Sequence, residues 1–112
     1  MYIGLFKVKP IIKPGYYPQI DENDVIKYQI NDSSIPSKLG QFFFDYINEE
    51  CGTLVAQYEY DYINPQQCRK LKEWIMNHNK LIEDNGLNEL FTVINSYCEK
   101  AIELDTGIEI DL

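Results

Sequence analysis

Residues 54–75 read LVAQYEYDYINPQQCRKLKEWI, and this stretch decides the fold because its periodicity changes halfway along. In the first half, Tyr58, Tyr60 and Tyr62 alternate with polar or acidic residues, which is the pattern of a strand with two unlike faces. The strand would carry tyrosines on one face and carboxylates on the other. Tyr58 and Tyr62 also lie four residues apart, so a helix is the alternative to the strand that we favour.

The second half of the stretch predicts a helix over residues 65–78. Asn64 offers a side-chain oxygen to the free N–H groups of a first turn, and Pro65 fits where no N–H donor is needed. Cys68, Leu71 and Trp74 then recur at helical spacing and form one apolar stripe. The stretch is therefore a strand followed directly by a helix.

The same two periodicities place the other elements. Alternating residues predict strands over 2–8, 24–30 and 108–112, and helical spacing predicts helices over 35–50 and 87–104. Together with the central stretch, they predict one α+β domain over residues 1–112, in which a small, mostly antiparallel sheet packs against about three helices.

Local signals fix several boundaries. Ser34 is placed to cap the first helix, and Gly52 follows its end as a C-terminal glycine. Between the first two strands, Pro14-Gly15 predicts a turn in a proline-rich loop. The neighbouring Tyr16 and Tyr17 are either an exposed binding element or a pair that packs back onto the core.

Charge is unevenly distributed along the chain. The 112 residues are 45% apolar and 25% charged, as in ordinary globular domains, but the net charge is −8. Residues 1–20 contain three lysines and no acid, so the remaining residues carry −11. Such a body repels nucleic acid and anionic membranes and attracts basic proteins, although the charge could also serve solubility alone.

The cysteines indicate a reducing compartment. Cys51, Cys68 and Cys98 are odd in number and form no C-x-x-C pair, and residues 1–10 lack the apolar stretch of a secretory signal. We therefore expect a cytoplasmic protein. With the single histidine, His78, these cysteines match no zinc spacing, and we expect neither a metal nor a cofactor.

Two carboxylate pairs suit either catalysis or binding. Glu59 with Asp61, and Glu109 with Asp111, are each separated by about 6.5–7 Å along a strand, a spacing compatible with general acid–base chemistry but more common on a solvated face. A binding role uses the same residues together with the tyrosines, which supply contact area and a polar tip. The predicted partner-binding residues are Tyr58, Glu59, Tyr60, Asp61, Tyr62, Asp105, Glu109 and Asp111.

Over residues 35–112, the run YEYDYIN-x3-C-x2-LK-x-W and the closing GIEIDL resemble the immunity proteins of bacterial contact-dependent growth inhibition and related polymorphic toxin systems. The resemblance implies a non-enzymatic cytoplasmic protein that binds a cognate toxin, often a nuclease, and blocks its active site or its access to substrate. It implies a basic toxin and transfers no catalytic residue. The basic residues 1–20 depart from this picture, which argues against placing them in the interface.

Two other functions fit the same sequence. One is an accessory protein of a phage or other mobile element that binds a different regulator. The other is a small hydrolase that uses the carboxylate pairs, and it would lose activity on Glu59→Gln while keeping its fold.

Overall fold

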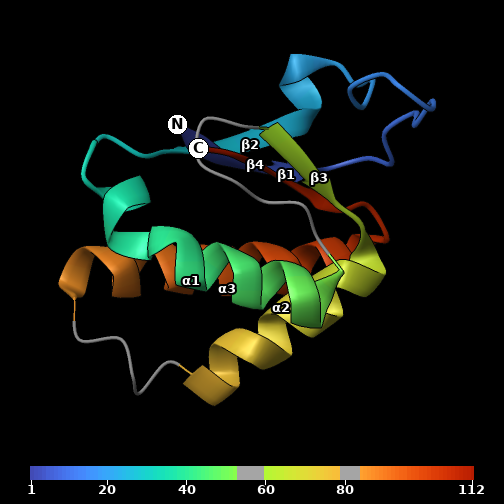
Figure 1. Ribbon diagram of the computed structural model, residues 1–112. Helices are drawn as coiled ribbons and strands as arrows, with labels where there is room; N and C mark the ends of the chain where they lie inside the picture. The colour runs from blue at the N-terminus through green and yellow to red at the C-terminus, as the bar shows by residue number, and fades with distance from the viewer. Residues whose placement is uncertain (53–59, 79–83) are drawn as a thin grey trace.

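The computed structural model describes residues 1–52, 60–78 and 84–112, without the side chains of residues 41–43 and 46. These residues form an α+β fold with a four-stranded antiparallel sheet on one side and helices on the other (Figure 1). This confirms the predicted fold class.

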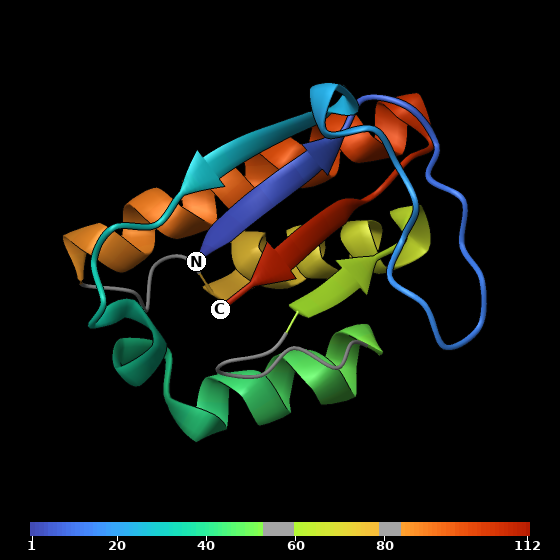
Figure 2. The same ribbon diagram turned by 90° about the horizontal axis from the view of Figure 1, so that it is seen from above.

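The first and last strands of the chain lie at the centre of the sheet. The strand order is β2-β1-β4-β3, and every neighbouring pair is antiparallel. The strands are β1 (Tyr2–Phe6), β2 (Val25–Gln29), β3 (Tyr60–Ile63) and β4 (Ile108–Asp111). The two ends of the chain therefore lie close together beside the sheet (Figure 2).

The helices lie on the same side of the sheet (Figures 1 and 2). They are α1 (Ile35–Cys51), α2 (Pro65–His78) and α3 (Asn85–Leu104), and a short 3-10 helix, Glu22–Asp24, precedes β2. The sheet therefore has one face covered by α1, α2 and α3 and a second face on which none of these three helices lies, whereas the short 3-10 helix lies on the side of that second face (Figure 1).

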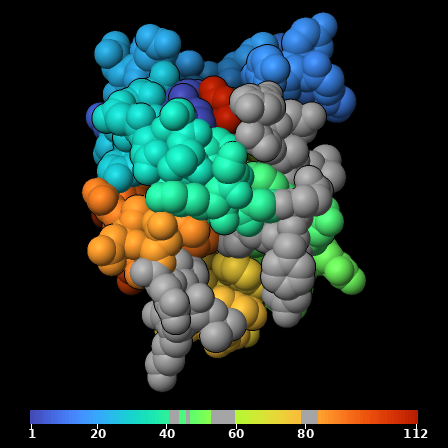
Figure 3. Space-filling view, turned by 60° about the vertical axis from the view of Figure 1, so that its left-hand side comes forward, coloured from blue at the N-terminus to red at the C-terminus, as the bar shows by residue number. Residues whose placement is uncertain are grey.

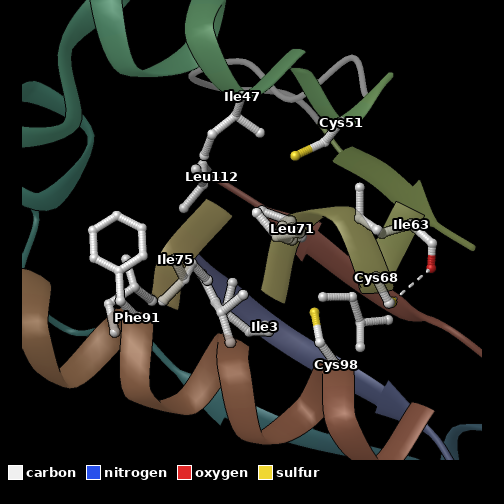
Figure 4. Packing of buried hydrophobic residues seen from close by; sticks show 14 of the residues in the cluster. Ile3, Ile47, Cys51, Ile63, Cys68, Leu71, Ile75, Phe91, Cys98 and Leu112 are labelled. Atoms are coloured by element: carbon white, nitrogen blue, oxygen red, sulfur yellow. Dashed lines mark hydrogen bonds between the residues drawn. The ribbon is translucent and has the colours of Figure 1, made fainter. Parts of the chain in front are cut away.

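The hydrophobic core fills the space between the sheet and the helices. Alternation along the central strands directs Ile3 and Leu5 of β1, and Ile108 and Ile110 of β4, into it. Side chains at helical spacing on the helices meet them, as Figure 4 shows for Leu71, Ile75 and Phe91 among others. The stripe predicted for α2 is buried, with Trp74 only 8% exposed.

The change from strand to helix occurs where the sequence predicts it. The backbone N–H of Gln67 donates to Oδ1 of Asn64 at 2.8 Å, and the N–H of Asn64 donates to Oε1 of Gln67 at 2.9 Å. This reciprocal pair is a capping box, so the predicted Asn64 cap is confirmed. Strand β3 confirms the strand for residues 60–62, and residues 54–59 lie outside the described part of the chain.

Helix α1 begins at Ile35 as predicted, but the predicted capping bond from Ser34 and the predicted end of the first strand are wrong. Ser34 makes no side-chain capping bond, because its own N–H and hydroxyl donate to Oδ1 of Asp32 at 2.9 and 2.6 Å. Strand β1 ends at Phe6 instead of residue 8, where the chain leaves the sheet. The Gly52 end of α1 is confirmed by its left-handed φ of 67°. A break at Gly40, with φ of 66°, was not predicted.

Candidate protein-binding surface

The sheet face away from the helices carries two rows of side chains that cross all four strands. Directly paired residues point to the same face, so the register gives one row of Gln29, Tyr2, Asp111 and Tyr60. The second row is Lys27, Gly4, Glu109 and Tyr62. Tyrosines and carboxylates from strands that are distant in sequence therefore share one surface, which we call the open sheet face.

A buried carboxylate lies at the centre of this face. Glu109 is only 6% exposed although it points away from the hydrophobic core. It occupies the space left by the missing side chain of Gly4, since a Cβ there would lie 2.6 Å from both Cγ and Oε1 of Glu109. The Tyr60 hydroxyl donates to Oε2 of Glu109 at 2.5 Å. A charged group is thus held by an aromatic donor within the sheet surface.

The tyrosines of this face are hydrogen-bond donors at neutral pH. Burial, followed by the charge and hydrogen bonding of Glu109, raises the pKa of Tyr2 above its ordinary value, and the same causes raise the pKa of Tyr60. Burial is also the main cause that raises the pKa of Tyr62 to about 12. Its hydroxyl donates to the carbonyl oxygen of Thr106 at 2.7 Å.

One cation already lies on the open sheet face. Nζ of Lys27 is 4.7 Å from the centre of the Tyr2 ring, which is a cation–π contact. By contrast, the Asp111 carboxylate forms no ion pair with any residue in the described ranges. The face therefore combines aromatic rings that accept a cation with a half-buried acid available to pair with one.

A projecting loop, residues 7–20, borders this face. The N–H of Tyr16 donates to the carbonyl of Lys13 at 3.1 Å, which confirms the predicted turn, and the φ of 80° at Gly15 is that of a type II turn. Tyr16 and Tyr17 are 71% and 74% exposed, so the exposed alternative holds for this pair. The Tyr17 ring packs edge-on against Tyr60, with centroids 4.9 Å apart. Figure 3 shows the blue N-terminal segments at the top of the molecule, above the turquoise first turns of α1.

The structure brings together half of the predicted partner-binding residues. Tyr60, Tyr62, Glu109 and Asp111 share the open sheet face, and Tyr58 and Glu59 lie outside the described residues. Glu109 is buried, so in this structure its carboxylate contacts Tyr60 and is largely shielded from solvent, and its predicted role as a charge contact stays a prediction. The cause of the burial is that Gly4 leaves room for its side chain beside Tyr60.

Asp61 and Asp105 lie elsewhere. Asp61 pairs with Ile110 and therefore points to the helix side of the sheet, apart from Glu109 and Asp111. Asp105 ends α3 with a left-handed φ of 56°, and its exposed carboxylate lies 3.5 Å from Nζ of Lys9.

Sequence reasoning missed Tyr2, Gly4 and Lys27, because their place on this face depends on strand pairing. One signal was present: a glycine inside an apolar strand often marks close approach of another group, and Gly4 receives Glu109 in this way.

The cysteines lie in the core. Cys68 and Cys98 are fully buried, and Figure 4 shows them with Cys51 among aliphatic side chains. The neighbouring Cys68, together with burial, raises the pKa of Cys98, and burial raises that of Cys51 to about 11. Both thiols are therefore protonated and poor nucleophiles at neutral pH.

No three histidine, cysteine, aspartate or glutamate side chains in residues 1–52, 60–78 and 84–112 are grouped so as to hold a metal ion. None of the described helices is both long and apolar enough to cross a membrane. Comparisons with models of protein families, with curated proteins and with solved structures found no match to this chain.

Proposed function

We propose that this chain is a non-enzymatic cytoplasmic inhibitor that binds a cognate basic protein toxin of a bacterial polymorphic toxin system. The open sheet face is the proposed contact surface. The observation that carries the proposal is the gathering of Tyr2, Tyr60, Glu109 and Asp111 on the sheet face that α1, α2 and α3 leave uncovered.

The chemistry of this face suits basic side chains of a partner. Tyrosine rings bind lysine and arginine through cation–π contacts, as Lys27 already does on Tyr2. Asp111 offers a charge-assisted hydrogen bond beside the rings. Because Glu109 holds the Tyr60 hydroxyl, that ring is ordered before the partner arrives, which lowers the entropic cost of binding.

The overall charge supports the same partner. Outside residues 1–20 the chain carries −11, and a charge of this size accelerates encounter with a basic protein at low ionic strength. A toxin that acts on nucleic acid is basic at its substrate site, so an acidic inhibitor can cover that site directly.

Affinity capture from the native host with the tagged chain tests the proposal. We expect recovery of a basic protein whose toxic activity is lost when this chain is added at equal concentration. Recovery of a partner whose activity does not change would support the mobile-element regulator instead. Failure to capture a partner, together with turnover of a small substrate by the chain, would support the hydrolase.

A pair of charge reversals then tests the surface. Asp111→Lys should slow association with the captured toxin by about tenfold at low salt, since it replaces the available acid of the open sheet face. Glu73→Lys makes the same charge change on an exposed position of α2, on the other side of the sheet. Equal effects of the two variants would show that only net charge matters, and would remove the open sheet face from the proposal.

A further inference from the structure

The 7–20 loop exposes an apolar surface that the proposed toxin contact does not use. Five of the eight large apolar side chains that are exposed on the described chain lie on it: Val8, Ile11, Ile12, Tyr16 and Tyr17. Exposed apolar groups gathered in this way mark an interaction site. Three lysines accompany them, and residues 1–20 contain no carboxylate. The occupant should therefore be both apolar or aromatic and acidic.

A surface with that chemistry lies beside the loop on the same molecule. The open sheet face presents the rings of Tyr2 and Tyr60 with the carboxylate of Asp111. The Tyr17–Tyr60 ring contact joins the loop to this face, so the two surfaces are continuous. A basic, apolar loop thus stands next to an acidic, aromatic face.

Two adjacent, complementary surfaces are what a twofold-symmetric interface requires. In such an interface the loop of one copy contacts the face of the second, and the loop of the second contacts the face of the first. A twofold axis parallel to the sheet, running between the loop and the face, produces this arrangement. It buries both loops and both faces, so no loop or face is left to bind a third copy.

We propose that this chain forms a symmetric homodimer in which the 7–20 loop of each copy docks on the open sheet face of the other. Ile11 and Ile12 supply apolar contacts to the tyrosine rings. Lys13, which forms no ion pair with a described residue, pairs with the other copy's Asp111. The proposed dimer forms between two copies of this chain without any toxin, so it can be tested on the purified chain alone.

Sedimentation equilibrium over a wide range of protein concentrations tests the dimer. We expect the mass to approach twice 13.2 kDa as concentration rises. Ile11→Ser combined with Ile12→Ser should weaken dimerisation by at least about 30-fold, the effect of losing one interface hot spot. Met76→Ser changes a comparably exposed apolar residue on α2 and should leave dimerisation unchanged. A monomer at every concentration overturns the proposal.

A charge exchange tests the pairing of loop and face. Lys13→Glu and Asp111→Lys should each weaken the dimer by about 5–10-fold, because each places like charges together. When the two variants are mixed, both loop–face contacts carry opposite charges again, so a mixed dimer should form with near wild-type affinity. Recovery in the mixture also shows that both variants are folded. If the two variants dimerise as strongly as the wild type, or if their mixture does not regain the affinity, the loop–face arrangement is overturned.

Discussion

At the scale of single residues, Gly4 and Glu109 form one packing unit. A methyl group on Gly4 would lie 2.6 Å from Cγ of Glu109. The Glu109 carboxylate is held by Tyr60 and the Gly4 backbone is held in the sheet, so neither can move away at low cost. We expect Gly4→Ala to lower the free energy of unfolding by about 1–3 kcal/mol, measured by urea denaturation. Gly86→Ala is the comparison variant: its Cβ would lie 3.2 Å from Oδ1 of Asp84, a milder approach than at Gly4, so it should cost less. In a Glu109→Ala background, Gly4→Ala should cost much less, and an unchanged cost would contradict the packing unit.

Burial of Tyr60, together with its hydrogen bond to Glu109, makes the free energy of unfolding depend on pH in the alkaline range. The pKa of Tyr60 is raised above its ordinary value of 10.0 in the folded state, so above about pH 10 the folded chain retains a proton that the unfolded chain loses. The stabilisation is complete below pH 10 and is lost as pH rises further. We expect the free energy of unfolding to fall less steeply between pH 10 and 12 for Tyr60→Phe than for the wild type. The measurement is urea denaturation at several pH values in the presence of reductant. If the free energy of unfolding falls equally with pH in Tyr60→Phe and in the wild type, the prediction is refuted.

A third residue prediction concerns the single tryptophan. The Trp74 ring stacks on His78 with centroids 4.5 Å apart and also contacts Phe91, and it is largely buried. Trp74→Ala should lower the free energy of unfolding by about 3–5 kcal/mol, through lost burial and the cavity left behind. A loss below about 1 kcal/mol would place the ring outside the core.

At the scale of secondary-structure elements, the two helix starts differ in a way that mutation can measure. Asn64 receives the capping bond at the start of α2, whereas Ser34 makes none at the start of α1. Asn64→Ala should therefore cost about 0.5–2 kcal/mol of stability, and Ser34→Ala clearly less. Equal losses, measured by thermal or urea unfolding, would contradict the capping assignment.

The elements themselves were predictable because their signals are local. Periodicity two and periodicity 3.6 placed the four strands and the three long helices of the described ranges, and Asn64 and Gly52 marked two of their boundaries. Helix α1 starts at the predicted residue, but the predicted capping bond from Ser34 is absent because Asp32, two residues earlier, accepts from both its hydroxyl and its N–H. Both serine and aspartate are good caps, so composition alone does not choose between them.

At the scale of the whole molecule, the open sheet face could not be predicted, because it is made by pairing distant strands. Tyr2 and Asp111 are the second and second-to-last residues of the chain, and the register places them side by side. Alternation correctly separated Asp61 from the tyrosines of its own strand. It could not show that β4 would bring its own carboxylates to the tyrosine side.

The two proposals share one face, and this gives a last prediction. If a toxin and a second copy both bind the open sheet face, each must exclude the other, so toxin binding should dissociate the dimer into complexes with one copy of each protein. The apparent affinity for toxin should then weaken as the concentration of this chain rises, because more of its faces are covered. The Ile11→Ser/Ile12→Ser variant removes that dependence if those residues contact only the second copy. Sedimentation of the captured toxin with wild type and with this variant measures both effects. A complex containing two copies of this chain would show that the toxin binds another surface.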